Sequence, residues 1–384
     1  GSDPSLPVVL LNSHYDVVPA DEQHWDTDPF AAELTEDGKI FGRGTQDMKS
    51  VCIQYIVALQ RLLVQARKAT GAEDDAPAFR RTIVLTFVPD EEIGGRDGMG
   101  ALLGSDFFKN LGEIGLALDE GLANPGEKYT VFYGERSPWW IIVEAEGPTG
   151  HGSRFIENPA THRLLRVAQK GIEFRAQQEK ALGLVEANGT GGCKHSQAKK
   201  LGDVTTLNLT MLKAGVTGDG GETWNLNVIP VEAQAGFDIR LSPDMPMEEM
   251  SALLDKWTEE EGLSWKFAHW TCPLQKHFVT STDAKENPWW GVFTNAAAAS
   301  GIALEPEIFP AATDSRFLRE LGIRALGFSP MANCPILLHE HNEYIPRDVF
   351  VKGIGVYCGL LPALFNFDEP KMEATDASAA PTKE

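Results

Sequence analysis

The sequence predicts an α/β protein with a mixed sheet between helices, into which a second, α+β domain is inserted. Apolar runs of strand length alternate with segments of helical spacing from residue 8 to 121 and again from 287 to 364, the pattern of a layered α/β domain. The residues between them, 136–270, follow the order strand, helix, strand, strand, helix, strand. That order is the split βαββαβ plan of a small α+β sandwich.

Three strands are expected in the first segment, at residues 8–11, 82–88 and 114–118. The second is apolar throughout, which is typical of a strand covered on both faces. A helix is expected after Asp47, where apolar residues recur at helical spacing from Met48 to Leu63, and another follows the glycines at 94–100.

The inserted segment and the last segment complete the expected order. Strands are expected at 139–146, 204–212, 231–241 and 265–270, and helices at 158–177 and 247–261. After them come helices at 287–300, from 314 and at 346–364, with strands at 305–309 and 325–328. We therefore predict a catalytic domain formed by residues 1–134 and 275–366, an inserted lid or dimerisation domain at 135–274, and a disordered tail at 367–384.

Charge and hydropathy exclude several classes of protein. The 384 residues include 55 acidic and 34 basic side chains, so the formal net charge of −21 opposes binding to nucleic acid or to anionic membranes. No apolar run approaches the roughly 18 residues of a transmembrane helix, and we see no signal peptide before the first strand. We expect a soluble protein.

The cysteines predict the compartment. The five cysteines are far apart in the sequence, and no two of them form a CxxC pair. They are Cys52, Cys193, Cys272, Cys334 and Cys358. This usage suits a reducing compartment, so we expect a cytoplasmic protein with neither a disulfide framework nor a thiolate metal site.

Histidines and carboxylates gather at the strand ends and at the turn before the first helix. They are His14 with Asp16, Asp47, Asp90–Glu91–Glu92, Asp119–Glu120, and His339 or His341. Each has an ordinary alternative: a surface turn for His14, a helix cap for Asp47, and an exposed acidic turn for the triplet. Ligands of open α/β sheets, however, bind outside the carboxyl ends of the strands, where these residues would converge.

This ligand chemistry predicts a hydrolytic metal site. Imidazole and carboxylate without sulfur fit zinc or cobalt, and five ligands with a shared carboxylate fit two ions about 3.5–4 Å apart. Neighbouring residues of an extended chain point in opposite directions, so Glu91 and Glu92 are expected to have different tasks. One of them can bind metal while the other acts as a base.

Several strings resemble the family of dinuclear zinc peptidases and amidohydrolases, which includes aminoacylase, carboxypeptidase-like and desuccinylase members. They are SHYDVVP (13–19), GRGTQDMK (42–49), PDEEIGG (89–95), LDEG (118–121) and HEHNE (339–343). The strings ERSPWW (135–140), GHGSRF (150–155) and ATDSR (312–316) resemble the aminoacylase branch of that family. The match runs from the first residues to about residue 364.

The resemblance implies two Zn²⁺ per subunit and five metal ligands: His14, Asp47, Glu92, Glu120 and His339. Asp47 would bridge both ions, with His14 and Glu120 completing one site. Glu92 and His339 would complete the other; His339 is preferred over His341 because the histidine of the family stands four residues before a glutamate, here Glu343. Asp16 would orient His14, and Glu91 would be the general base.

The resemblance also implies a homodimer in which His151 stabilises the oxyanion in the site of the partner subunit. Arg240 would receive the carboxylate of the substrate, and Asn227 and Thr313 would line the same pocket. The implied activity is the hydrolysis of N-acyl-L-amino acids. Two alternatives stay open: a dipeptidase or carboxypeptidase of the same family, and a catalytically inactive binding or scaffold protein.

The sequence departs from the family pattern in two places. The family has a further segment before its first zinc histidine, so we expect part of the catalytic domain to be missing from this chain. The stretch 182–200 is expected to be an added loop in the lid, and no chemistry is assigned to it.

Overall fold

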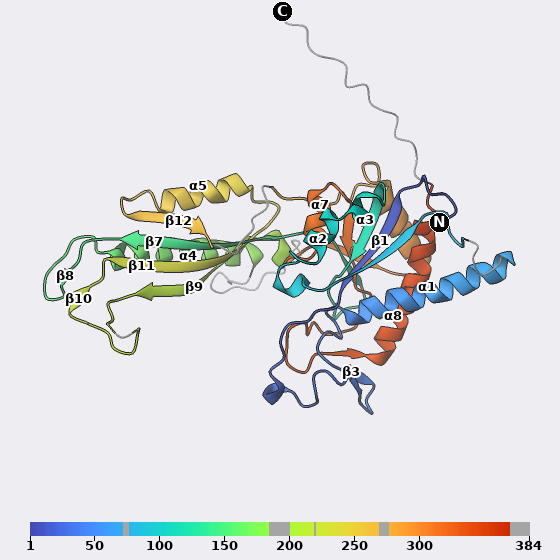
Figure 1. Cartoon of the computed structure of the whole chain (residues 1–384), viewed down its shortest axis with the longest axis horizontal. Coiled ribbons are helices and arrows are strands. Elements are labelled where there is room, and N and C mark those ends of the chain that lie inside the picture. The colour runs from blue at the N-terminus through green and yellow to red at the C-terminus, as the bar shows by residue number, and fades with distance from the viewer. Residues whose placement is uncertain (72–76, 184–199, 219, 269–275, 369–384) are drawn as a thin grey trace, which may run out of the picture. The chain divides into compact units, whose positions relative to one another are not determined.

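A computed structural model describes residues 1–71, 77–183, 200–218, 220–268 and 276–368. The chain forms two compact units (Figure 1): residues 1–129, 281–305 and 329–384 in the first, and 130–280 and 306–328 in the second. This division assigns 306–328 to the second unit, whereas the predicted boundaries assign it to the catalytic domain. Residues 184–199 of the added loop and 369–384 of the tail lie outside the described residues.

Parallel strands form the centre of the first unit. Strand β1 (Val8–His14) lies between β4 (Ile83–Val88) and β5 (Ile114–Asp119) and is parallel to both. All seven β1 residues are buried. The carboxyl ends of the three strands therefore meet at one edge, where His14 pairs in register with Val88.

Long helices pack together beside these strands. Helix α1 (Lys49–Thr70) contacts α8 (Arg347–Phe365), which also contacts α6 (Pro288–Ala299). Figure 1 shows α1 and α8 crossing in the first unit. Tyr55 of α1 and Tyr357 of α8 are both fully buried, with ring centroids 4.6 Å apart.

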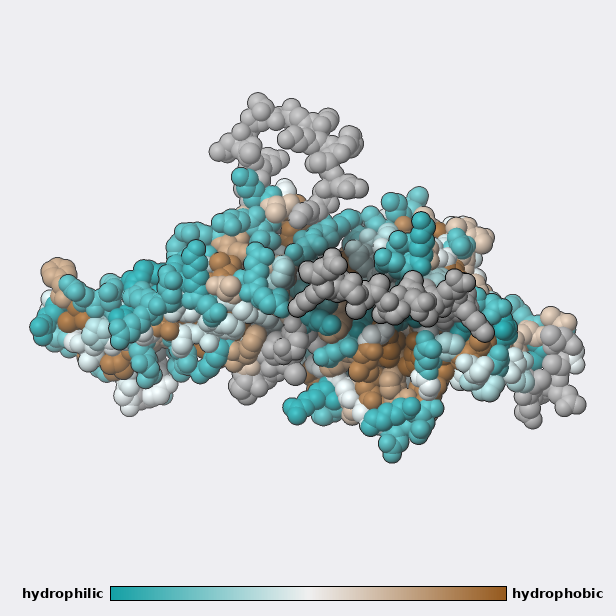
Figure 2. Space-filling model, turned by 90° about the horizontal axis from the view of Figure 1, so that it is seen from above, coloured by the Kyte–Doolittle hydropathy of each residue, from teal (hydrophilic) through white to brown (hydrophobic). Residues whose placement is uncertain are grey.

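By length and composition, one helix among the described residues is apolar enough to cross a membrane. This helix is α8. Its packing against α1 and α6 gives its apolar character a different explanation, since the core helix of a globular unit has the same composition. Hydrophilic side chains predominate on the face of the molecule in Figure 2.

Short elements complete the first unit. Strands β2 (Glu33–Leu34), β3 (Lys39–Phe41) and β15 (Tyr344–Pro346) form a small sheet, which brings the region of residue 344 beside that of residue 41. The others are α2 (Met99–Gly104), α3 (Asp106–Lys109) and the single turns η1 (Glu22–His24) and η2 (Glu91–Ile93).

The second unit has the predicted βαββαβ order, given by β7 (Ser137–Glu146), α4 (Ala160–Leu182), β9 (Thr206–Ala214), β11 (Glu232–Leu241), α5 (Met247–Trp257) and β12 (Leu263–Phe267). Its four strands are antiparallel in the order β12-β7-β11-β9. Alternate residues of β7 are buried, and they share one hydrophobic core with α4 and α5. The predicted fold class is confirmed for this unit.

The second unit also contains elements outside this order. The strands at 304–309 and 325–327 and the helix at 315–320 were predicted, whereas the strand at 129–135 and the shorter elements were not. Strand β6 (Tyr129–Glu135) lies between β13 (Leu304–Phe309) and β14 (Ala325–Gly327), and it is antiparallel to β14. The remaining elements are α7 (Ser315–Glu320), the turn η3 (Leu201–Asp203) and the short pair β8 (Gly150–His151) and β10 (Val228–Ile229). Strands therefore pair in both directions: β1 is parallel to β4 and β5, and β6 is antiparallel to β14. The predicted mixed sheet requires both directions.

One strand end was predicted wrongly, and one alternative is excluded. Strand β1 continues to His14, three residues beyond its predicted end, because buried Asn12 donates a hydrogen bond to Asp119 (3.0 Å) and Ser13 donates one to the Thr86 carbonyl (3.1 Å). Asp47 is not a helix cap: the residue before α1 is Met48, which makes no capping bond with its side chain. The Asp47 carboxylate is therefore available for other contacts.

Candidate metal centre

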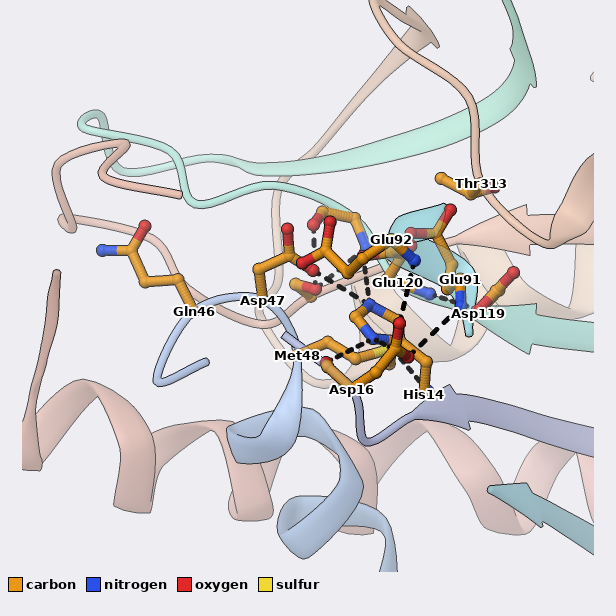
Figure 3. Close-up of polar contacts among 12 residues, drawn as sticks. His14, Asp16, Gln46, Asp47, Met48, Glu91, Glu92, Asp119, Glu120 and Thr313 are labelled. Atoms are coloured by element: carbon orange, nitrogen blue, oxygen red, sulfur yellow. Dashed lines mark hydrogen bonds and ion pairs between the residues drawn. The ribbon is translucent and has the colours of Figure 1, made fainter. Parts of the chain in front are cut away.

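Six side chains of the first unit form a cluster beside the carboxyl ends of the parallel strands. Figure 3 labels all of them except His339. They form two groups: His14, Glu91 and Glu120, and Asp47, Glu92 and His339. In each group, one possible ligand atom per residue lies within 4.8 Å of the others. All five residues predicted as metal ligands are among the six, together with the predicted base.

Asp47 connects the two groups through its two carboxylate oxygens. Its Oδ1 lies 3.0 Å from Nε2 of His14, and its Oδ2 lies 3.3 Å from Nε2 of His339. An aspartate with one oxygen toward each of two imidazoles has the arrangement of a carboxylate that bridges two ions.

Each histidine also faces a glutamate. Oε2 of Glu120 lies 3.4 Å from Nε2 of His14, and Oε2 of Glu92 lies 3.0 Å from Nε2 of His339. The other oxygen of Glu92, Oε1, is buried and has no hydrogen-bond partner among the described residues. A buried carboxylate oxygen without a donor is costly unless a cation compensates it, so these residues fit a metal site.

The electrostatics of the cluster also favour positive charge. Burial disfavours a charged His14 ring, but the neighbouring carboxylates, foremost Glu120, outweigh burial and raise the pKa of His14 above its usual value. Burial and the charge of Asp47 raise the pKa of Glu120 well above its usual value. Hydrogen bonds to Asp47 and Glu92 raise the pKa of His339 to about 10. A pair of dications satisfies the same demand and leaves the imidazole nitrogens free to ligate.

Asp16 contacts two parts of the centre. His14 Nδ1 lies 3.1 Å from the carbonyl oxygen of Asp16 and 3.4 Å from its carboxylate. The same carboxylate accepts hydrogen bonds from the backbone N–H groups of Glu91 (3.2 Å) and Glu92 (3.1 Å). Asp16 thus contacts the His14 ring, which it is predicted to orient, and it also contacts the backbone that carries both glutamates.

Glu91 and Glu92 belong to different groups, as the sequence predicts for residues with different tasks. Both are in the turn η2, and both side chains are partly buried. Glu91 lies with His14 and Glu120, so the geometry by itself allows it to be either a ligand or a base.

The geometry favours His339 over His341. His339 faces Asp47 and Glu92, whereas the His341 ring stacks on His24 with centroids 5.0 Å apart. His341 belongs to neither donor group found among the described residues.

The structure reveals buried residues that support the centre, a task that the sequence did not predict for them. Asp119 accepts hydrogen bonds from the side chain of Asn12 (3.0 Å) and the backbone N–H of Glu120 (2.9 Å), so it orients the strand end. Arg43 and Glu343 form a buried ion pair of 2.8 Å beside the turn that carries Asp47. The signal for Asn12 was a polar residue that interrupts an apolar strand; Arg43 carried no signal apart from the motif.

The remaining predicted residues lie in the second unit. His151 is exposed at the end of β8, where its Nδ1 lies 2.8 Å from Oγ of Ser153. The backbone carbonyl of Asn227 accepts a hydrogen bond from Gly152 (2.7 Å). The tasks assigned to His151 and Asn227 stay predictions.

Arg240 and Thr313 already have partners within this unit. Arg240 forms a two-point ion pair with Asp238 (2.7 and 3.0 Å) and lies over the Trp140 ring at 5.6 Å. Thr313 is buried and donates to Glu135 through its backbone N–H (2.5 Å) and its hydroxyl (3.0 Å). Their tasks toward a substrate also stay predictions.

With this geometry established, comparison with known proteins identifies the family. The model of peptidase family M20/M25/M40 matches residues 10–363. This chain belongs to that family. It is 47% identical over 369 residues to aminoacylase-1 of Dictyostelium discoideum, an alignment that covers 96% of this chain and 85% of that protein. It is 46% identical over 366 residues to mouse aminoacylase-1, covering 95% and 81%.

A solved structure of the M20 family has the same fold. The metallo-carboxypeptidase Sso-CP2 from Sulfolobus solfataricus matches with a TM-score of 0.62 at 20% identity, covering 93% of this chain and 85% of that one. The predicted resemblance to the family, and to its aminoacylase-1 members, is therefore confirmed, as is the fold class.

Removal of divalent ions should destabilise the protein, because the clustered carboxylates then lose the charge that compensates them. An ion present at a thousand times its dissociation constant contributes about 4 kcal/mol to the free energy of unfolding. Thermal melting with and without a chelator measures this contribution, and re-addition of the ion should restore the melting temperature. Identical melting curves would contradict the metal site.

Proposed function

We propose that this protein is a zinc-dependent amidohydrolase that cleaves N-acyl-L-amino acids into a carboxylate and a free L-amino acid. The observation that carries the proposal is the pair of donor groups joined by Asp47, with Glu91 beside them, in a chain 47% identical to an aminoacylase-1. The paired groups support metal-dependent hydrolysis, and the relatives support the substrate class.

Zinc is the ion that suits this donor set best. His14, Asp47 and Glu120 would hold one ion, and Asp47, Glu92 and His339 the other. Imidazole and carboxylate donors without thiolate are typical of catalytic zinc sites. When bound, the two ions supply Lewis acidity, which lowers the pKa of water and polarises the amide carbonyl.

The side chains then direct the protons and the substrate. The Glu91 carboxylate takes a proton from the attacking water and delivers it to the nitrogen of the leaving amine as the C–N bond breaks. Arg240 receives the substrate carboxylate through its planar guanidinium, with Asn227 and Thr313 beside it. His151 of the partner subunit donates a hydrogen bond to the oxyanion.

A homodimer is part of this proposal. His151 is exposed, and so are apolar side chains close to it in sequence or pairing: Phe155 is wholly exposed, and Leu226, two residues before β10, is 93% exposed. Apolar side chains with such exposure favour an interface with another chain. A second copy would cover them and bring His151 to its task.

A cytoplasmic location is the other part. Three cysteines in the described residues, Cys52, Cys334 and Cys358, are free thiols, and Cys334 is buried. Free thiols are typical of a reducing compartment.

Assays of N-acetyl-methionine and of dipeptides test the substrate class directly. We expect turnover of the acylated amino acid and little or no turnover of the dipeptides, measured by release of free amino acid. The opposite preference would make the protein a dipeptidase or carboxypeptidase. Absence of turnover of either substrate by the metal-loaded protein would favour an inactive binding or scaffold protein.

Substitution of the two neighbouring glutamates separates base from ligand. Glu91→Gln should lower kcat by about 10²- to 10⁴-fold while two zinc ions per subunit remain bound, because the loss concerns proton transfer. Glu92→Gln should lower the metal content, because it removes a ligand. Elemental analysis and kinetics on both variants check this; equal metal loss in both would show that Glu91 is also a ligand.

Mixing of two inactive variants tests the site shared between subunits. Glu91→Gln and His151→Ala subunits should together recover up to about a quarter of the wild-type activity, because half of the dimers are hybrids with one complete site each. Activity is measured after subunit exchange, with each variant alone as the control. If verified hybrid dimers stay inactive, His151 does not act across an interface.

A further inference from the structure

We propose that Arg43 and Glu343 are positioning residues that tie the turn carrying Asp47 to the segment carrying His339, and so set the affinity of the second donor group for its metal ion. The second donor group is Asp47, Glu92 and His339. The inference rests on the proposed metal-dependent function, but a separate experimental result would contradict it.

Glu343 holds the turn. Its side chain is fully buried, and its carboxylate accepts hydrogen bonds from the backbone N–H groups of Gly44 (3.1 Å), Gln46 (2.7 Å) and Asp47 (3.4 Å). Four residues before it in the sequence is His339. The carboxylate therefore fixes the backbone of Asp47 from the segment that supplies His339.

Arg43 holds the segment in return. Its Nη1 donates to the Glu343 carboxylate (2.8 Å) and to the Glu340 carbonyl (3.1 Å), and its Nη2 donates to the His339 carbonyl (3.4 Å). His339 has a φ of 64°, in the left-handed region that only a few per cent of non-glycine residues adopt. Contacts to its carbonyl help to keep the backbone in this conformation, on which the direction of the imidazole depends.

Gln46 adds a third connection between the same segments. Its Nε2 donates to the carbonyls of Pro335 (3.0 Å) and Tyr344 (2.8 Å), and its Oε1 accepts from the backbone N–H of Leu337 (2.9 Å). The segment that carries His339 is thus fastened on both sides of the histidine. Arg43 and Glu343 are 300 residues apart in sequence, so the tie is made by side chains and not by the connecting chain.

The charges of the pair matter as well as its shape. In Glu343→Gln, the amide keeps one acceptor oxygen but turns an NH₂ group toward buried donors, either the Arg43 guanidinium or the turn N–H groups. A buried donor that faces another donor forces a shift of the backbone or of the side chain. The shift falls on Asp47 and His339, two of the three residues of the second donor group. Asp47 also faces His14, but the first site keeps His14 and Glu120, which come from other segments, so the second ion is weakened more.

The experiment measures binding of Zn²⁺ to the metal-depleted full chain, using elemental analysis and competition with a chromogenic chelator. We expect Glu343→Gln to bind one of its two ions about 10- to 100-fold more weakly, with the other ion retained. Absorption spectra of the Co²⁺-loaded proteins give a second readout: the bands of one site should be lost or altered.

Glu135→Gln is the matched control. Glu135 and Arg319 also form a buried ion pair (3.0 Å), and Glu135 also accepts a backbone N–H, from Thr313, but this pair lies in the second unit. This variant should lose stability and still bind two ions with wild-type affinity.

Arg43→Lys is a milder second variant, used in case Glu343→Gln does not fold, because lysine keeps the positive charge but not the planar fork of donors. It should weaken the same ion to a smaller extent. Wild-type affinity for both ions in folded Glu343→Gln, or in Arg43→Lys if Glu343→Gln does not fold, overturns the proposal. Failure of both variants to fold overturns it too, because the pair would then serve general stability. A wild-type protein that binds no ion would instead defeat the proposed function.

Discussion

The arrangement of the first unit depends on compensating buried carboxylates with positive charge. Asp47, Glu92 and Glu120 lie close together at the carboxyl edge of parallel strands, and their visible partners are the imidazoles of His14 and His339. Removing such groups from water is costly, and neighbouring like charges add to the cost. A pair of divalent ions held by these residues would offset the charge, and in the proposed function the same ions would activate water beside Glu91.

Buried carboxylates elsewhere in the chain show a different solution to the same problem. Glu343 is paired with Arg43 and Glu135 with Arg319, and each carboxylate also accepts backbone N–H groups. A guanidinium satisfies a carboxylate permanently, so these pairs hold loops in place. Imidazoles leave the carboxylates of the centre able to bind ions. The partner type therefore distinguishes structural from functional burial of charge in this protein.

Much of the fold and the centre was predictable because polar residues follow the apolar run at the end of each strand. Apolar runs that stop shortly before His14, Asp90 and Asp119 indicate strands that deliver polar residues to one edge. Asp47 shows the limit of local reasoning: an aspartate before a helix suggests a cap, and only the long-range contacts with His14 and His339 reveal its actual partners.

Other parts could not be read from the sequence. Strand β6 was missed because it ends at Glu135 and β7 begins at Ser137, so no turn signal in the composition separates the two strands. The Arg43–Glu343 pair joins positions 300 residues apart, and no periodic pattern encodes such a contact. The tasks of His151 and Arg240 depend on a second chain and a substrate, so the residues of one chain could suggest them only through resemblance to a family.

The order in which the ligands appear along the chain has a consequence for biosynthesis. His14, Glu91 and Glu120 leave the ribosome early, and the strands that carry them pair with one another within the first 119 residues. His339 follows only after the whole second unit has been synthesised. The residues of the first donor group are thus available while synthesis continues, whereas the second group lacks a member until His339 has been added. A centre with both groups can therefore form only after nearly 340 residues of this sequence have been synthesised.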